Sequence, residues 1–126
     1  MKILVAEDDE SSYIYLATAL KGIVSELLKA DTGTEAVELC KSHPDTDLIL
    51  MDIKMPLLDG YEATEKIREF NQKVVIIAQT AYALMGDKEK AMAAGCNDYV
   101  AKPIDRTMLI RLINGHIAGR NTKVIR

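Results

Sequence analysis

Short runs of apolar residues alternate along the chain with segments in which apolar residues recur at helical spacing. Nearly continuous apolar runs are typical of strands that are covered on both faces. Five such runs predict strands at residues 2–6, 26–30, 47–51, 73–78 and 98–101. The other segments predict helices at residues 12–23, 34–41, 60–70 and 86–94, and from about residue 105 onward. Strands that alternate with helices in this way predict an α/β domain with a parallel sheet and helices on both faces.

Single residues predict where several of these helices begin and end. Thr34 and Asp59 are candidate N-caps, because a side-chain oxygen at that position accepts a hydrogen bond from the first helical turn. Gly95 is a natural C-cap for the fourth helix. We expect one domain at residues 1–118, followed by a loose tail at residues 119–126. The scattered methionines are interpreted as core fillers: Met51, Met55, Met85, Met92 and Met108.

The composition is that of an ordinary globular domain. The chain has 126 residues, of which 48% are hydrophobic and 28% charged, with a net charge of −3. This charge gives no reason to expect contact with nucleic acid or a membrane surface. No apolar run approaches the roughly 20 residues that span a bilayer, and no signal peptide opens the chain, so we expect a cytoplasmic protein. Cys40 and Cys96 lack motif spacing and are interpreted as small packing residues.

Polar residues follow four of the predicted strands, at the point where each strand ends. Glu7, Asp8 and Asp9 come after the first strand, Asp52 after the third, Gln79 and Thr80 after the fourth, and Lys102 after the fifth. Binding chemistry in parallel sheets gathers at the carboxyl ends of the strands, so we expect these side chains to meet at one edge. Clustered carboxylates repel one another unless a divalent cation intervenes, and an oxygen-only cluster suits Mg²⁺. A cation, a nucleophilic carboxylate, a lysine and a hydroxyl together indicate phosphoryl transfer to an aspartate.

Taken singly, each of these residues has a simpler explanation. The acidic run at residues 7–10 is typical of a solvated loop or the start of a helix. Lys102 alone would be a surface lysine, and Thr80 alone would be a turn or cap residue. Their shared position at one edge of the sheet is what favours a common site.

Four segments of the chain resemble the receiver domain of two-component response regulators, over essentially the whole length. They are ILVAEDD near the start, DLILMDIKMPLLDG in the middle, IIAQTA after it and AAGCNDYVAKPI near the end. The resemblance implies a doubly wound, flavodoxin-like (βα)5 domain with its strands in the order 2-1-3-4-5. It also implies a phosphoacceptor in phosphorelay signalling, which is modified in a Mg²⁺-dependent step and is not an enzyme acting on other molecules.

The resemblance assigns roles to the acidic residues and to the loop after the third strand. Asp52 takes the position of the phosphoacceptor. Glu7, Asp8, Asp52 and the main-chain carbonyl of Lys54 would hold Mg²⁺. The side chain of Lys54 stands where the family varies and is expected to tune the lifetime of the phosphoryl group.

Further positions match the part of the family that responds to phosphorylation. Thr80 and Lys102 would contact the phosphoryl oxygens, and Tyr99 would be the switch aromatic whose rotamer follows Thr80. Pro103 suggests a cis Lys-Pro bond that directs Lys102 inward. Tyr82 stands at another variable position and is also expected to tune the phosphoryl lifetime.

The resemblance implies a histidine kinase or a histidine phosphotransfer protein as the phosphodonor. The segment MGDKEKAMAAGCNDYVAKPI resembles receivers fused to hybrid sensor kinases. An excised piece of a larger protein and a protein that acts alone by docking a partner therefore both remain open. We expect no direct contact of this domain with nucleic acid or membrane, and the sequence does not identify the downstream partner.

Two other classes of function share this fold. A small Mg²⁺-dependent phosphatase would need a second aspartate two residues after Asp52, where Lys54 stands. A flavodoxin-like ligand-binding module would need a phosphate-cradling loop, but the acidic loop at residues 7–10 repels phosphate unless a cation intervenes. The isolated histidines, His43 and His116, lack a kinase-like motif and are expected to be structural.

Overall fold

Five parallel strands form the centre of the fold, in the order β2-β1-β3-β4-β5. Their bounds are β1 (Lys2–Ala6), β2 (Glu26–Ala30), β3 (Leu48–Asp52), β4 (Val75–Thr80) and β5 (Asp98–Ala101). The predicted fold class and strand order are therefore confirmed. The structure is a computed structural model that describes residues 1–81 and 86–125, with side chains described as far as Ala118.

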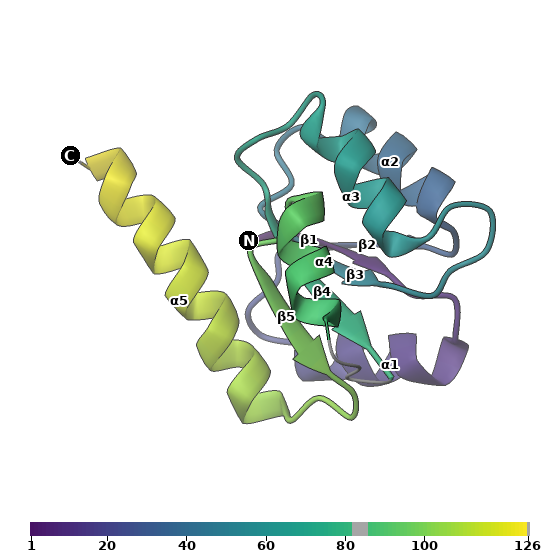
Figure 1. The fold of residues 1–126 in the computed structure, drawn as a ribbon. Helices are drawn as coiled ribbons and strands as arrows, with labels where there is room; N and C mark the ends of the chain where they lie inside the picture. The colour runs from purple at the N-terminus through teal and green to yellow at the C-terminus, as the bar shows by residue number, and fades with distance from the viewer. Residues whose placement is uncertain (82–85, 126) are drawn as a thin grey trace.

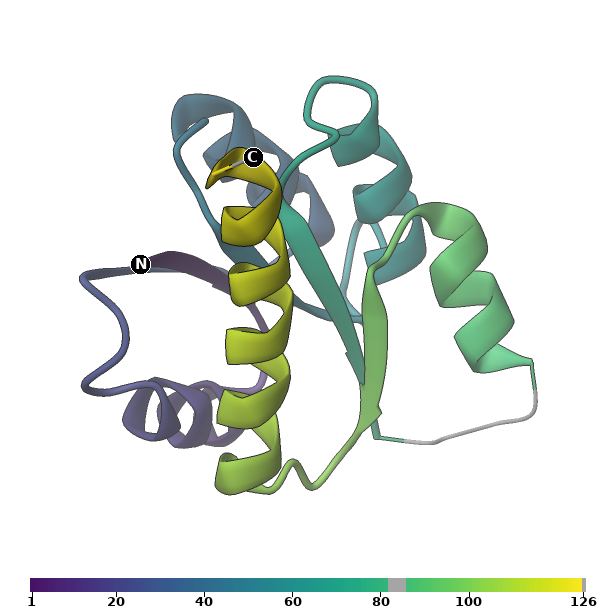
Figure 2. The same cartoon turned by 90° about the vertical axis from the view of Figure 1, so that its left-hand side faces the viewer.

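Helices cover both faces of the sheet (Figure 1 and Figure 2). Their bounds are α1 (Glu10–Ala19), α2 (Gly33–Ser42), α3 (Gly60–Arg68), α4 (Asp87–Ala94) and α5 (Arg106–Ile125). The first and last helices, α1 and α5, lie on one face, whereas α2, α3 and α4 lie on the other. This arrangement follows when parallel strands are joined by right-handed crossovers.

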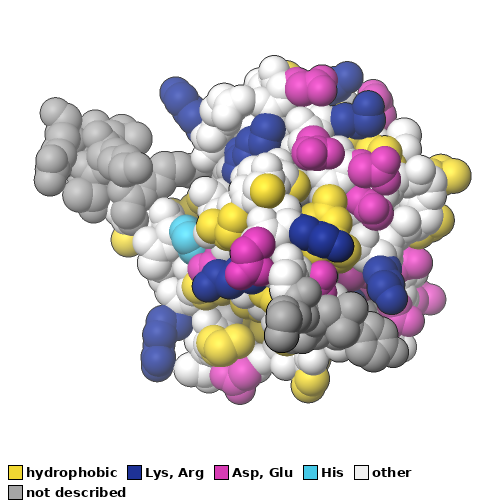
Figure 3. Space-filling view, in the orientation of Figure 1, with side chains coloured by type: hydrophobic (Ala, Val, Ile, Leu, Met, Phe, Trp, Pro, Cys, Tyr) yellow, Lys and Arg dark blue, Asp and Glu magenta, His cyan; other side chains and the backbone are white. Residues whose placement is uncertain are grey.

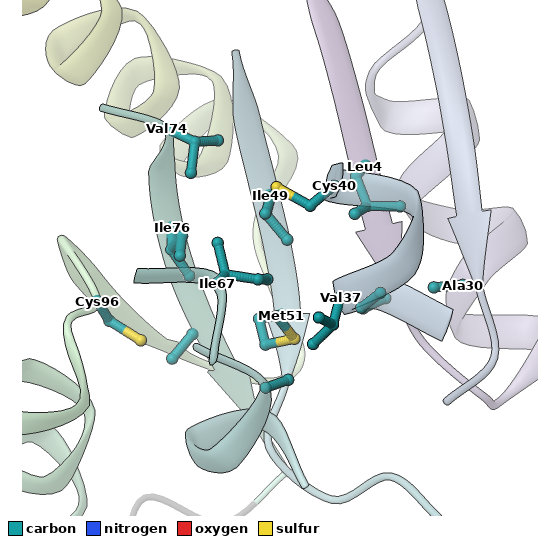
Figure 4. Close-up of a cluster of buried hydrophobic side chains, with 14 of the residues drawn as sticks. Leu4, Ala30, Val37, Cys40, Ile49, Met51, Ile67, Val74, Ile76 and Cys96 are labelled. Carbon is teal, nitrogen blue, oxygen red and sulfur yellow. The ribbon is translucent and has the colours of Figure 1, made fainter. Parts of the chain in front are cut away.

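Alternate side chains of each strand enter two separate apolar cores. On one face, Leu4, Ile49 and Ile76 pack beneath α2, α3 and α4. Figure 4 shows Val37 of α2 and Ile67 of α3 lying in this core. The core on the other face is formed with α1 and α5 by Ile3, Val5, Leu48, Leu50, Val75, Ile77, Leu16, Leu20, Leu109 and Ile113. Burial of one such side chain contributes about 1.5–3 kcal/mol, so the cores on both faces hold the strand ends in place.

Side-chain caps set the starts of α2 and α3. Asp59 accepts a hydrogen bond from the main-chain N–H of Glu62, and the Glu62 carboxylate accepts one from the N–H of Asp59, so this predicted cap is confirmed. The cap of α2 is Thr32, and the prediction of Thr34 is wrong. The backbone is extended at Thr32, which lets its hydroxyl accept a hydrogen bond from Glu35 N at 3.0 Å.

The first helix starts earlier than the apolar pattern predicts. It begins at residue 10 because Asp9 caps it, accepting a hydrogen bond from Ser12 N at 2.9 Å. It ends before the predicted residue 23, and Gly22 has a φ of 95° in the turn that follows. Gly95 ends α4 as predicted, with a φ of 115° that glycine adopts without steric cost.

Only part of the methionine prediction holds. Met51 and Met55 are buried in the core, as predicted. Met92 and Met108 are 45% and 47% exposed, because their side chains lie on the solvent side of α4 and α5, so the prediction is wrong for these two. Met85 lies outside the described residues.

The last helix continues past residue 118, where we place the end of the domain. Its backbone is helical as far as Ile125, which differs from the loose tail expected at residues 119–126. No proline interrupts this segment, so the backbone hydrogen bonds of the helix continue. The boundary between domain and tail stays a prediction. None of the helices in the described part of the chain is long and apolar enough to cross a membrane.

Candidate functional site

The register of the sheet brings the predicted site residues to one edge. The strands β1 and β3 end in register, so Glu7 and Asp52 emerge side by side. Asp52 pairs with Gln79 of β4, and Thr80 ends that strand. Lys102 directly follows β5, and its N–H donates to the main-chain oxygen of Thr80 at 2.7 Å. The parallel strands therefore deliver all of these side chains to their common carboxyl end.

Lys102 lies close to two of the carboxylates. Its Nζ is 2.5 Å from Glu7 Oε1 and 3.7 Å from Asp52 Oδ1. Glu7 is 1% exposed and Asp52 is 6% exposed, so both carboxylates are withdrawn from water. Two buried negative charges repel each other, and the ammonium group offsets that repulsion. In this structure the nearest partner of Lys102 is thus Glu7.

Three carboxylates lie close enough to share one cation. One oxygen each from Glu7, Asp8 and Asp52 lies within 4.8 Å of the other two. Asp8 is exposed while the other two are buried, so the cluster is open to solvent on the Asp8 side. Mg²⁺ takes oxygen ligands, binds through few carboxylates and keeps several waters. The residues therefore fit the predicted metal.

Burial and charge repulsion act together on Asp52. Its pKa is raised from 3.8 to about 7, first by burial and then by the negative charge of Glu7, while Lys102 acts in the opposite direction. A carboxyl group with such a pKa is partly protonated near neutral pH. A cation among the carboxylates would favour the ionised, nucleophilic form.

Two glycines allow the loop after β3 to pack closely against neighbouring backbone. A Cβ on Gly60 would overlap the main-chain oxygen of Asp52, and one on Gly33 would overlap that of Leu58. Each glycine therefore permits a close contact between backbones, and α3 begins directly against the peptide of Asp52. Lys54 lies in this loop with an exposed side chain. The direction of its carbonyl toward a cation stays a prediction.

Thr80 and Tyr99, the predicted switch pair, lie next to each other. Burial raises the pKa of the Tyr99 hydroxyl and Asp87 raises it further, whereas a hydrogen bond with Thr80 acts in the opposite direction. The Tyr99 hydroxyl is 3.5 Å from Asp87 Oδ2, and the Tyr61 hydroxyl is 3.4 Å from the main-chain oxygen of Asp87. The sequence did not indicate Tyr61 or Asp87, because they are distant along the chain and belong to no motif. The switching role of Thr80 and Tyr99 stays a prediction.

The peptide bond between Lys102 and Pro103 is cis, the geometry suggested by the sequence. Gln79 follows the fourth predicted strand, and no role was predicted for it. It is fully buried at the end of β4, and neither polar atom of its side chain has a hydrogen-bond partner among the described residues. Its one signal in the sequence is an amide within the apolar run VVIIAQT. Tyr82 lies outside the described residues.

The two histidines lie away from this edge. His43 Nδ1 is 2.8 Å from Lys2 Nζ, and His116 Nε2 is 2.9 Å from Asp98 Oδ2. Each thus pairs with a strand residue, as expected of a structural role. On the face drawn in Figure 3, acidic and basic side chains are interspersed over the described surface.

Comparisons with known proteins agree with this geometry. The sequence matches the family model of the response regulator receiver domain over residues 3–114. It is 39% identical, over 115 residues, to the signal transduction histidine-protein kinase BarA of Escherichia coli K12. That match covers 90% of this chain but only 12% of the kinase, so the chain spans a small part of the length of this relative.

Two solved structures extend the comparison. One is the receiver domain of a sensor histidine kinase from Pseudomonas aeruginosa PAO1, with a magnesium ion coordinated in the active-site cleft. It is 38% identical with a TM-score of 0.84, and the match covers 93% of this chain and 97% of that one. The other contains the Saccharomyces cerevisiae histidine phosphotransfer protein Ypd1 and the receiver domain of its downstream response regulator Ssk1. It is 33% identical with a TM-score of 0.82, and the match covers 90% of this chain and 86% of that one.

The family model covers most of the chain, and the strand order and the acidic cluster agree with it. The chain belongs to the response regulator receiver domain family.

Proposed function

We propose that Asp52 accepts a phosphoryl group from the histidine of a kinase or of a histidine phosphotransfer protein. The observation that carries this proposal is the buried Asp52 carboxylate, which lies beside Glu7, Asp8 and Lys102 at one edge of the sheet. An oxygen of Asp52 attacks phosphorus and forms the new O–P bond. The P–N bond to the donor imidazole breaks, and its electron pair stays with the imidazole nitrogen.

The acidic cluster would hold Mg²⁺ through Glu7, Asp8 and Asp52, with the Lys54 carbonyl as a further ligand. When bound, the ion offsets the negative charge of the carboxylates and of the phosphoryl oxygens. The Lys102 ammonium lies near both Glu7 and Asp52, so a short movement of its flexible side chain would bring it to a phosphoryl oxygen.

Thr80 supplies the second donor. Its side chain is buried at the end of β4, the strand that pairs with β3 beside Asp52. A phosphoryl group adds negative charge and acceptor oxygens, which hydroxyl and ammonium donors satisfy. Movement of Thr80 toward the phosphoryl group would leave space that the Tyr99 ring fills. The surface of α4 and β5 would then differ between the two states, which is the signal read by a partner.

The histidine donor is supported by the relatives. The matched region of BarA belongs to a histidine kinase, and the solved yeast complex joins a receiver domain to a histidine phosphotransfer protein. We infer that this chain serves as a cytoplasmic signalling acceptor that catalyses only its own phosphorylation and dephosphorylation. Because it spans a small part of the matched kinase, a place inside a longer hybrid kinase and a separate response regulator are both consistent with the match.

Acetyl phosphate tests the acceptor directly. With Mg²⁺ present, intact-mass spectrometry should show one phosphoryl group on the wild type and none on Asp52→Asn. Asp59→Asn is the matched control, because it makes the same substitution near the site and asparagine still caps α3. Labelling of Asp52→Asn to the level of the control would remove Asp52 from the proposed role.

The metal is tested without a phosphodonor. Asp8→Asn should weaken Mg²⁺ binding by about tenfold or more, because one charged oxygen ligand is lost. Asp9→Asn is the control, since Asp9 caps α1 and asparagine preserves that cap. Equal Mg²⁺ affinities for the two variants in a calorimetric titration would exclude Asp8 from the metal site.

A further inference from the structure

A cavity of about 410 Å³ opens between the start of α1 and the loop that joins β5 to α5. Tyr15 and Leu16 of α1 line one side, and Pro103 and Ile104 line the other. The Tyr15 hydroxyl donates to the main-chain oxygen of Ile104 at 2.5 Å and so bridges the two sides. A concave site of this volume, walled mainly by apolar side chains, is the usual form of a small-molecule site.

Gln79 lines the same cavity from β4. The strand residues two and four positions before it, Ile77 and Val75, pack in the core beneath α1 and α5, so strand alternation places Gln79 on that face too. Both polar atoms of its side chain are buried and lack partners within the described residues. A buried polar atom that is left unpaired destabilises the fold, because it has lost its hydrogen bonds to water. A ligand that pairs with both atoms would therefore offset this cost.

The amide of Gln79 offers one donor and one acceptor side by side. A planar ring with an adjacent N–H and C=O, as in a lactam, or with the corresponding edge of a purine base, complements both atoms at once. The glutamine side chain pairs with the adenine edge in this bidentate manner. We propose that this cavity binds a small, neutral, planar nitrogen heterocycle whose amide-like edge pairs with Gln79.

The charges around the cavity favour a neutral ligand. Lys102 lines the cavity as well, but its ammonium group lies 2.5 Å from Glu7 and is already paired. The remaining walls are mostly aliphatic or aromatic, and a charged ligand would lose its hydration there without compensation. Gln79 is fully buried in this conformation, so a ligand reaches its amide only when the side chains that cover it move aside.

Binding of isoquinolinone, followed by amide NMR in metal-free buffer without phosphodonor, tests this site apart from phosphorylation. It should shift the signals of Ser12, Tyr15 and Gln79. Its N-methyl derivative lacks the donor and should bind about tenfold more weakly or worse, because a hydrogen bond is lost and an acceptor is left unpaired. Gln79→Leu should reduce binding to a similar extent. Gln72→Leu, the same change at an exposed position outside the cavity, should leave binding unchanged.

A second variant covers the case in which Gln79→Leu does not fold. Ser11→Trp places a large ring at the mouth of the cavity on an exposed position, and should block binding while leaving the fold intact. Three results would overturn the proposal: no binding of isoquinolinone at millimolar concentration, equal binding of the N-methyl derivative, or unchanged binding to the cavity variants.

Discussion

Asp52 is a side chain whose chemistry is set by its neighbours. Burial and Glu7 raise its pKa to about 7, so the folded, metal-free protein holds a proton there that the unfolded chain releases near pH 4. A group whose pKa is higher in the folded state stabilises the fold below its unfolded pKa. That contribution is lost as the pH rises through the folded pKa. This stabilising contribution is therefore largely lost above neutral pH, and a bound cation would offset the negative charge that remains.

This linkage gives a pH-dependent prediction. In EDTA at about pH 8, Asp52→Asn should raise the Tm by about 5 °C or more, because a buried charge worth a few kcal/mol has been removed. Below about pH 3 the difference should shrink toward zero, since Asp52 is then mostly protonated in both the folded and the unfolded state. Thermal unfolding followed by circular dichroism across this range measures the difference. A difference in Tm between the variant and the wild type that does not change with pH would contradict the raised pKa of Asp52.

Helix α3 depends on a contact that only glycine permits. Gly60→Ala should destabilise the fold by about 3 kcal/mol or more, because the added Cβ overlaps the backbone of Asp52 and its neighbour Ile53. Gly115→Ala in α5 has open space around its Cβ and should be neutral or stabilising, by up to about 1 kcal/mol. Urea unfolding compares the two variants. Equal free energies of unfolding for the two variants would contradict the close contact between the start of α3 and the end of β3.

At the scale of helices and strands, the sequence predicted the features that depend on hydrophobic periodicity and on recognisable motifs. Strands, helices and the strand order followed from the alternation of patterns and from the receiver motifs, and Asp59 and Gly95 were predicted as caps. The cap at Thr32 was missed because both threonines precede the same apolar stripe, and only the backbone angle at Thr32 distinguishes them. Gln79 was placed at the edge of the sheet but given no role, because the lack of a hydrogen-bond partner depends on tertiary packing.

At the scale of the whole molecule, the site and the α4–β5 surface are connected through packed side chains. Thr80 is the last residue of β4 and forms a hydrogen bond with Tyr99. The Tyr99 hydroxyl also lies near Asp87 at the start of α4. Tyr61 reaches the main chain of Asp87 from α3. If phosphorylation of Asp52 draws Thr80 away, as we propose, the contacts of Tyr99 and Tyr61 with Asp87 should change, whereas β2 lies at the opposite edge of the sheet from β5.

Beryllofluoride, a stand-in for the phosphoryl group, tests this connection. With Mg²⁺ it should shift the amide NMR signals of residues 80–81 and 86–102 more than those of residues 25–45. Thr80→Ala should reduce the response, while Thr34→Ala, an exposed threonine on α2, should leave it unchanged. Shifts of equal size in both regions, or a full response in Thr80→Ala, would mean that the switch does not run through this face.

The most direct test of the account identifies the residue that carries the phosphoryl group. Borohydride reduces an aspartyl phosphate to homoserine, so the modified position can be read from peptide mass spectra after labelling with acetyl phosphate and Mg²⁺. We expect homoserine at position 52 and at no other aspartate. Homoserine at Asp8 or Asp9, or a phosphoryl group that resists reduction because it sits on His43 or His116, would contradict it.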